Sequence, residues 1–232
     1  MRFPLRFSLR LLVATITVTG VLLGIWTHRS REQRRIVTQI RTNGGWVRYD
    51  IERDVWGQPA ESRIPKALLN GLGEDYFHEV VEVETHSAAD LAELSRWQNV
   101  YCLHINISTM TDADFVPIAQ LRKLKAIDIY GDRSDPNTRI SDRSMELLAK
   151  LPVLELVNLE SSQITAKGLA KLAASTSLRK LYVSSPDSSI EETAADPLRE
   201  QITDFSLRRS APGGFGQIVA KWSGSRPPGP RP

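Results

Sequence analysis

One apolar spacing recurs along the middle of this chain: an apolar residue, a second one three positions later, and a third two positions after that. It occurs at Val100-x-x-Leu103-x-Ile105, Leu124-x-x-Ile127-x-Ile129, Leu154-x-x-Val157-x-Leu159, Leu178-x-x-Leu181-x-Val183 and Ile202-x-x-Phe205-x-Leu207. The first residues of successive copies lie 24, 30, 24 and 24 positions apart. A unit this short cannot enclose an apolar core alone, so its copies must stack on one another. The spacing therefore predicts a repeat protein with one continuous core.

Each copy predicts a short parallel strand followed by a helix, because the side chains of a strand alternate between its two faces. Thr111, Ser141 and Thr165 follow three of the strands, where a hydroxyl can cap a helix, and Asp112 and Asp142 suit the positive helix end. Apolar residues at helical spacing come next: Phe115, Ile118 and Leu121; Met145, Leu148 and Leu151; Leu169 and Leu172. The predicted fold class is α/β, a leucine-rich-repeat solenoid with a curved parallel sheet and helices on its convex side. The alternative is a set of ordinary βα units of a doubly wound domain, whose crossovers usually need more residues.

The ends of the repeat region are irregular, as expected where a solenoid meets water. Val80-x-x-Val83, followed by a helix over 89–94, indicates a degenerate first unit. The long unit carries six extra positions in the turn-forming segment 130–139, which predicts a loop outside the core. Pro186 and Pro197 interrupt the helix of the fourth clear unit. Residues 80–209 are the predicted repeat region.

The N-terminus predicts a transmembrane segment from Leu11 to Thr27, seventeen residues without a charge. At 1.5 Å per residue it spans about 25 Å, slightly less than the ~30 Å hydrocarbon core of a bilayer. Arginines flank it on both sides, and Trp26 lies where an interfacial aromatic is expected. A cleaved signal peptide is the alternative, but the segment ends in Ile-Trp-Thr-His-Arg, without small residues for cleavage. Residues 1–28 are therefore predicted to be a basic flank and an uncleaved signal anchor.

The orientation of this anchor is weakly determined. Three arginines precede the apolar segment, and four arginines with Glu32 follow it before residue 36, so the positive-inside rule gives two nearly equal topologies. A short basic head before a large C-terminal domain is typical of an anchor that leaves that domain outside the cytoplasm. The prediction is a single-pass membrane protein whose repeats lie on the non-cytoplasmic side.

Charge is distributed in blocks along the chain. Residues 1–42 carry eight Arg and one Glu, residues 43–204 have a net charge of −9, and residues 205–232 carry five basic residues and no acid. The overall pI of about 9.1 thus reflects the two ends, and the repeat region is acidic. An acidic face does not bind phosphates, so nucleic acid is not an expected partner.

Three further segments complete the predicted domain organisation. Residues 29–42 indicate a basic juxtamembrane helix with Ile36, Val37 and Ile40 on one side, ended by the Asn-Gly-Gly turn. Residues 43–79 are predicted to cap the first repeat, with a strand over 46–52 and a helix beginning near Pro65. Residues 210–232, a basic segment rich in Pro and Gly, are predicted to be a disordered tail.

The chain as a whole resembles membrane-anchored leucine-rich-repeat proteins of environmental bacteria, which have a repeat of about 24 residues. The resemblance lies in residues 6–12, 44–50 and 73–77 and in the repeats, of which Ile-Thr-Ala-Lys-Gly-Leu-Ala-Lys-Leu at 164–172 fits the repeat pattern best. It implies a parallel-sheet solenoid in a membrane protein. Pro186 and Glu191 depart from the pattern in the fourth unit.

No catalytic motif is visible, so an enzyme is not expected, and neither is a cofactor or a metal site. The single cysteine, Cys102, lies in a predicted strand and is assigned a structural role. None of His28, His78, His86 and His104 has a partner at a sequence-local metal spacing.

The concave face is the predicted binding surface, because the residues between the buried strand positions point outward there. The candidate residues are His104, Asp128, Asn158 and Tyr182, with Tyr130 and Glu160 two positions further along their strands. Tyr is enriched in binding patches because it offers a large contact area at low entropic cost. Two functions stay open: an anchored module that binds a protein or peptide, and a structural envelope component that self-associates.

Overall fold

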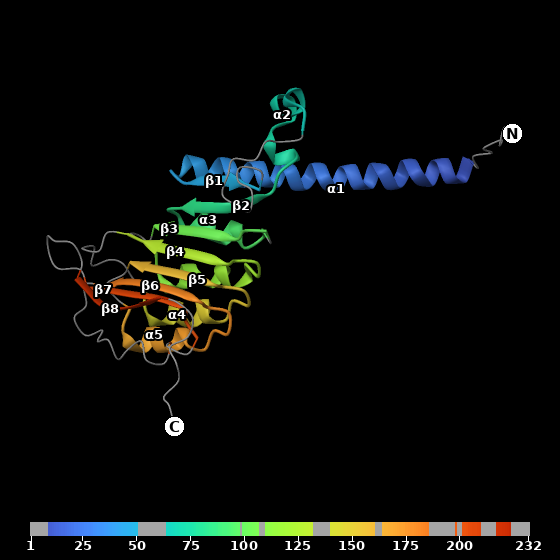
Figure 1. Cartoon of the computed structure of the whole chain (residues 1–232). Helices are drawn as coiled ribbons and strands as arrows, with labels where there is room; N and C mark the ends of the chain where they lie inside the picture. The colour runs from blue at the N-terminus through green and yellow to red at the C-terminus, as the bar shows by residue number, and fades with distance from the viewer. Residues whose placement is uncertain are drawn as a thin grey trace.

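The computed structural model of the chain describes residues 9–50, 64–97, 99–106, 110–131, 140–160, 164–185, 198, 201–209 and 217–223. Within these residues one sheet contains eight strands in sequential order (Figure 1). The strands are β1 (Trp46–Tyr49), β2 (Val80–Thr85), β3 (Cys102–Asn106), β4 (Ala126–Tyr130), β5 (Leu156–Glu160), β6 (Lys180–Ser185), β7 (Asp204–Arg209) and β8 (Gln217–Ser223). The helices are α1 (Leu9–Thr42), α2 (Lys66–Leu72), η1 (Glu74–Tyr76), α3 (Ala88–Leu94), η2 (Asp112–Gln120), α4 (Asp142–Ala149) and α5 (Ala166–Leu172). The α/β class predicted from the sequence is confirmed.

Strands β2 to β7 are parallel, and their register follows the apolar spacing of the sequence. The middle apolar residues of the copies are paired in one row and are fully buried: Val83, Leu103, Ile127, Val157, Leu181 and Phe205. The degenerate first unit joins this row because β2 pairs Val83 with Leu103. One continuous apolar core therefore runs across the units.

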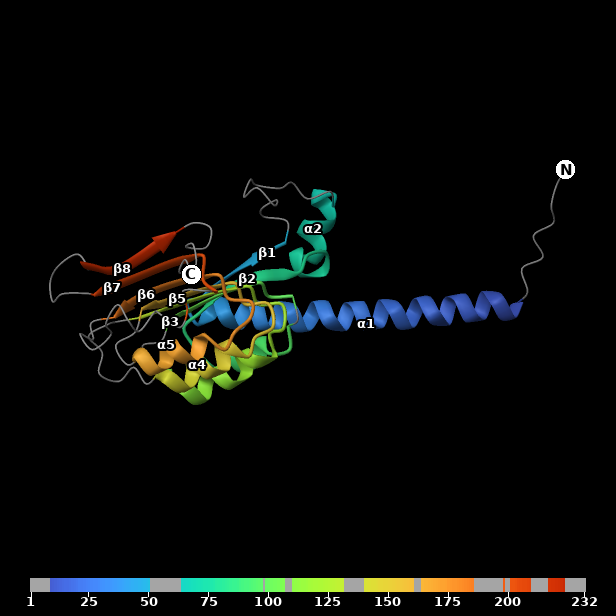
Figure 2. The ribbon, with the colours of Figure 1, turned by 60° about the horizontal axis from the view of Figure 1, so that its bottom comes forward.

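The helices that follow the strands lie on one face of the sheet (Figure 2). Ser141 and Thr165 cap α4 and α5 as predicted, accepting hydrogen bonds from the backbone N–H groups of Arg143 and Lys167. The helix after β3 differs, because η2 is a 3-10 helix with Pro117 inside it. A proline has no N–H to donate and its ring crowds the preceding turn, so this segment cannot form a regular α-helix.

Helix α1 is continuous across the boundary that the sequence predicts between the anchor at 1–28 and the juxtamembrane helix at 29–42. It runs unbroken from Leu9 to Thr42, away from the sheet at its N-terminal end (Figure 1). Its N-terminal part is apolar and exposed, and is long and apolar enough to cross a membrane. Its last turns bury Ile36, Val37 and Ile40 in the same core as the strands. The helix ends where Gly44 has φ +86° and the Gly45 N–H donates to the Ile40 carbonyl at 2.9 Å.

Antiparallel strands close both ends of the parallel array. β1 pairs with β2 at the outer edge of the first unit. Ile51 and Glu52 of the predicted strand lie outside the described residues. At the other end β8 pairs with β7, which corrects the prediction of a wholly disordered tail. Pro and Gly dominate the flanks of that tail, but Gln-Ile-Val-Ala-Lys-Trp-Ser at 217–223 favours a strand and β7 offers it an edge. Several predicted features lie outside the described residues: the rest of the tail, the segment 132–139, Pro186 and Pro197.

Candidate functional site

The face of the sheet opposite α3, η2, α4 and α5 is called the open face. His104, Asp128, Asn158 and Tyr182 occupy neighbouring positions on it, one from each of the strands β3 to β6. Tyr130 and Glu160 lie on the same face at the ends of β4 and β5. All six side chains are half-buried. The structure therefore brings the sequence-predicted residues onto one surface, in the predicted order.

Three of these residues form a hydrogen-bonded chain across the strands. The Asn158 Nδ2 group donates to Asp128 Oδ1 at 2.9 Å, and Asp128 Oδ2 lies 3.4 Å from His104 Nδ1. Tyr182 is not part of this chain, because its hydroxyl donates to Asp204 on β7 at 2.6 Å. The polar groups in this row are thus held in fixed orientations by their neighbours.

Tyr130 makes its contact in the opposite direction, towards β2. Its hydroxyl is hydrogen-bonded to Glu84, reaching across the intervening strand β3. Burial and this carboxylate both raise the pKa of the Tyr130 hydroxyl above its ordinary value, so it is a neutral donor at physiological pH. Glu84 also accepts from the Trp46 indole and pairs with His86.

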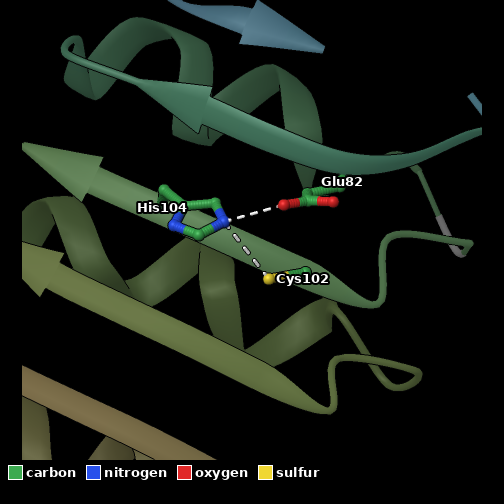
Figure 3. A group of neighbouring side chains, drawn as sticks. All are labelled: Glu82, Cys102 and His104. Atoms are coloured by element: carbon green, nitrogen blue, oxygen red, sulfur yellow. Dashed lines mark hydrogen bonds and ion pairs between the residues drawn. The ribbon is translucent and has the colours of Figure 1, made fainter. Parts of the chain in front are cut away.

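The β1 end of the open face carries a second group of side chains that meet at His104 (Figure 3). His104 Nε2 lies 3.0 Å from Glu82 Oε1 and 3.4 Å from Cys102 Sγ. Each of these three residues offers an atom that can bind a metal ion, and the three atoms lie within 4.8 Å of one another. Trp46 flanks the imidazole with 5.5 Å between ring centroids, and Arg48 lies over the Trp46 ring while pairing with Glu82.

These neighbours change the charge of the imidazole. The hydrogen bond to Asp128, then those to Cys102 and Glu82, raise the pKa of His104 to about 12, against the opposite effect of burial. His104 is therefore an imidazolium that joins three strands through its two ring nitrogens. Its positive charge partly offsets the acidic side chains beside it.

The sequence-predicted binding surface includes neither Glu82 nor Cys102. Neither residue forms a motif with its sequence neighbours, and Cys102 is predicted to have a structural role. The signal that connects them is the offset of twenty positions between Val83 and Leu103, because that register places Glu82 beside Cys102 and Glu84 beside His104. His104 then follows Cys102 by two positions, on the same face of its strand.

A cavity of about 950 Å³ lies apart from the open face, where α1 meets η1. Trp26 makes edge-on contacts with Tyr76 and Phe77, with ring centroids 5.6 and 6.0 Å away. Gln33 donates to the His78 carbonyl at 2.7 Å. These contacts fasten the helix to the globular part at the C-terminal end of its apolar segment and just beyond it.

The open face offers hydrogen-bond donors, acceptors and aromatic rings in a fixed row, which is suited to binding an extended chain of polar groups.

No protein-family model matches this chain, and no curated protein sequence matches it either.

Proposed function

We propose that this protein is a membrane-anchored leucine-rich-repeat solenoid whose open face binds a protein or peptide. Support for the solenoid comes from the period of 20 to 30 residues, the sequential order of parallel strands, and the helices packed on one face. Each unit contacts mainly its neighbours, which is the arrangement expected of repeat proteins. Support for an anchor comes from α1, whose exposed apolar part leads directly into the core.

The observation that carries the binding proposal is the row of His104, Asp128, Asn158 and Tyr182. These side chains are in register on a sheet face that no helix of the described residues covers. Their fixed orientation lowers the entropic cost of binding, because few side chains have to be ordered when a partner arrives. A short basic head before a large C-terminal domain is typical of an anchor that leaves this domain outside the cytoplasm, so we propose that the partner lies on the non-cytoplasmic side of the membrane.

A second candidate is a structural envelope component that associates with copies of itself. The observation in its favour is β8, whose outer edge has no partner strand among the described residues. An edge of this kind can pair with a strand of another chain.

Crosslinking of intact membranes followed by mass spectrometry separates the two candidates. If the open face binds a partner, crosslinks to one protein should map to β3–β6, and replacing Tyr130 and Tyr182 by Ala should abolish them. Val116→Ala is the matched control, because Val116 is exposed on η2, on the other face. Partners unchanged by the tyrosine replacements would contradict the binding proposal, and crosslinks only between β8 strands of two copies would support the structural role.

A further inference from the structure

Three metal-binding atoms converge on the open face beside β1, from Glu82, Cys102 and His104 (Figure 3). Two neighbouring strands supply them, and the backbone register pairs Glu82 directly with Cys102. The positions of the three side chains are therefore set by the sheet and not by a loop. The cluster is half-buried, so an ion could reach it from solvent.

We propose that Glu82, Cys102 and His104 bind a zinc ion through Oε1, Sγ and Nε2. Zinc bonds of about 2.0–2.3 Å to O, N and S in a tetrahedron place neighbouring ligand atoms roughly 3.3–3.6 Å apart. His104 Nε2 lies 3.0 Å from Glu82 Oε1 and 3.4 Å from Cys102 Sγ, and all three atoms lie within 4.8 Å of one another, so side-chain rotation can bring them around the ion. A thiolate and an imidazole favour zinc over magnesium or calcium, which take oxygen ligands.

The residues behind His104 have the arrangement that supports a metal-binding imidazole. Asp128 Oδ2 faces His104 Nδ1 at 3.4 Å, and Asn158 holds the other oxygen of Asp128 at 2.9 Å. Once the imidazole has lost one proton, a carboxylate at Nδ1 keeps the remaining proton on that nitrogen, so that Nε2 can bind the ion. The carboxylate also raises the basicity of the imidazole. Asp128 and Asn158 are therefore positioning residues for this site.

The charges around the cluster are compatible with a dication. Arg48 pairs with Oε2 of Glu82, which leaves Oε1 directed towards His104. Binding requires the imidazole and the thiol to lose their protons, so two positive charges enter as two protons leave. The net charge of the cluster is then unchanged, and zinc affinity should rise with pH. The site goes beyond the proposed recognition function and does not depend on it.

Cobalt titration of the full-length protein in detergent micelles, after treatment with a chelator, tests the proposal. We expect one Co²⁺ per chain, the intense visible bands of a tetrahedral ion, and a thiolate-to-cobalt charge-transfer band that Zn²⁺ removes. Cys102 is the only cysteine of the chain, so that band reports this residue alone. Zn²⁺ should also slow alkylation of Cys102 in the unmodified protein, a readout that requires no variant.

Variants assign the ligands. Cys102→Ser should abolish the charge-transfer band, and Glu82→Gln and His104→Gln should weaken zinc binding more than Asp128→Asn, for which a loss of about 10- to 100-fold is expected. His86→Gln is the control, because His86 lies outside the cluster and pairs with Glu84. The proposal is overturned if no charge-transfer band appears and alkylation is unaffected by Zn²⁺. It is also overturned if all these variants bind zinc equally, which would indicate adventitious surface binding only.

Discussion

The carboxylate of Asp112 binds Ser141, the helix cap of the next unit, through both the backbone N–H at 2.9 Å and the hydroxyl at 2.5 Å. Ser144 donates to the same carboxylate from its own N–H and hydroxyl. Asp142 repeats the relationship one unit later, accepting from the N–H of Thr165 at 2.9 Å and from its hydroxyl at 2.6 Å. The acidic residues after the caps Thr111 and Ser141 thus fasten their units to the following ones, in addition to any effect on their own helices.

Replacing Asp112 by Ala should destabilise the protein more than replacing Asp142, because Asp112 accepts four hydrogen bonds and Asp142 accepts two from Thr165. Each hydrogen-bond donor that is left partly buried without an acceptor lowers the free energy of unfolding by up to about 3 kcal/mol. Urea unfolding in detergent measures the change in free energy of unfolding. Arg143→Ala, at an exposed neighbouring position, should change it by less than about 0.5 kcal/mol. Equal unfolding midpoints for all three variants would refute this role.

The same carboxylate predicts a loss of stability in acid. Burial alone would raise the pKa of Asp112, but the hydrogen bonds from Ser141 and Ser144 lower it below its ordinary value of 3.8. A lowered pKa in the folded state contributes stability above pH ~4, which is lost as pH falls towards the folded pKa. Asp112→Asn should therefore remove part of the acid dependence measured by unfolding at pH 2 to 6. A variant with an unchanged acid profile would show that Asp112 is not responsible.

Gly168→Ala should destabilise the protein, although Ala usually favours a helix by up to about 1 kcal/mol. A Cβ at this position would lie 2.2 Å from Asp142 Oδ1 and 3.2 Å from the Asp142 Cα. The Asp142→Ala background should reduce the cost of this change, which a double-mutant cycle measures. Gly71→Ala is the control, since nothing lies within 4 Å of a Cβ there and α2 should gain stability. Additive effects at 142 and 168 would exclude the predicted contact.

His104 should stay protonated at pH 8 in chelator-treated protein, because Asp128, Cys102 and Glu82 raise its pKa to about 12. Nitrogen chemical shifts of the imidazole measure this by NMR. Asp128→Asn should lower the pKa, whereas Glu146→Gln, on the exposed surface of α4, should not. The raised pKa stabilises the fold fully below pH ~6.5, and this contribution declines as pH rises towards the folded pKa. The stability lost in Asp128→Asn should therefore be larger near pH ~6 than near pH ~9. A neutral imidazole at pH 7 would contradict the prediction.

The last turns of α1 should be required for folding, while its apolar part should not. Ile40→Ala should cost about 2–5 kcal/mol, because Ile40 is fully buried in the shared core. Thr38→Ala, two positions away and exposed, is the matched control. A chain beginning at Ile25, which keeps Trp26 and its contacts with Tyr76 and Phe77, should keep its circular dichroism spectrum and its thermal transition. Unfolding of that chain would show that the apolar segment contributes to the fold itself.

The parallel strands and their register follow directly from the sequence, since one apolar spacing fixes both the strands and the buried row Leu103, Ile127 and Val157. The continuity of α1 does not follow, because the change from apolar to basic composition near residue 28 marks a change of environment and not a helix end. β8 depends on an edge that exists only after β7 has folded. The cluster of Glu82, Cys102 and His104 could be found only by combining the offset of the degenerate first unit with the alternation of each strand.

In each strand, one row of residues faces the core and the adjacent row faces the open side. Single cysteines placed at Ile127, Asp128, Val157 and Asn158, in a Cys102→Ser background, measure this through their alkylation rates in the folded protein relative to denaturant. Rapid alkylation at 128 and 158 with strong protection at 127 and 157 is the predicted result. Equal rates at neighbouring positions, or protection at 128 and 158 instead, would contradict this alternation of core and open faces.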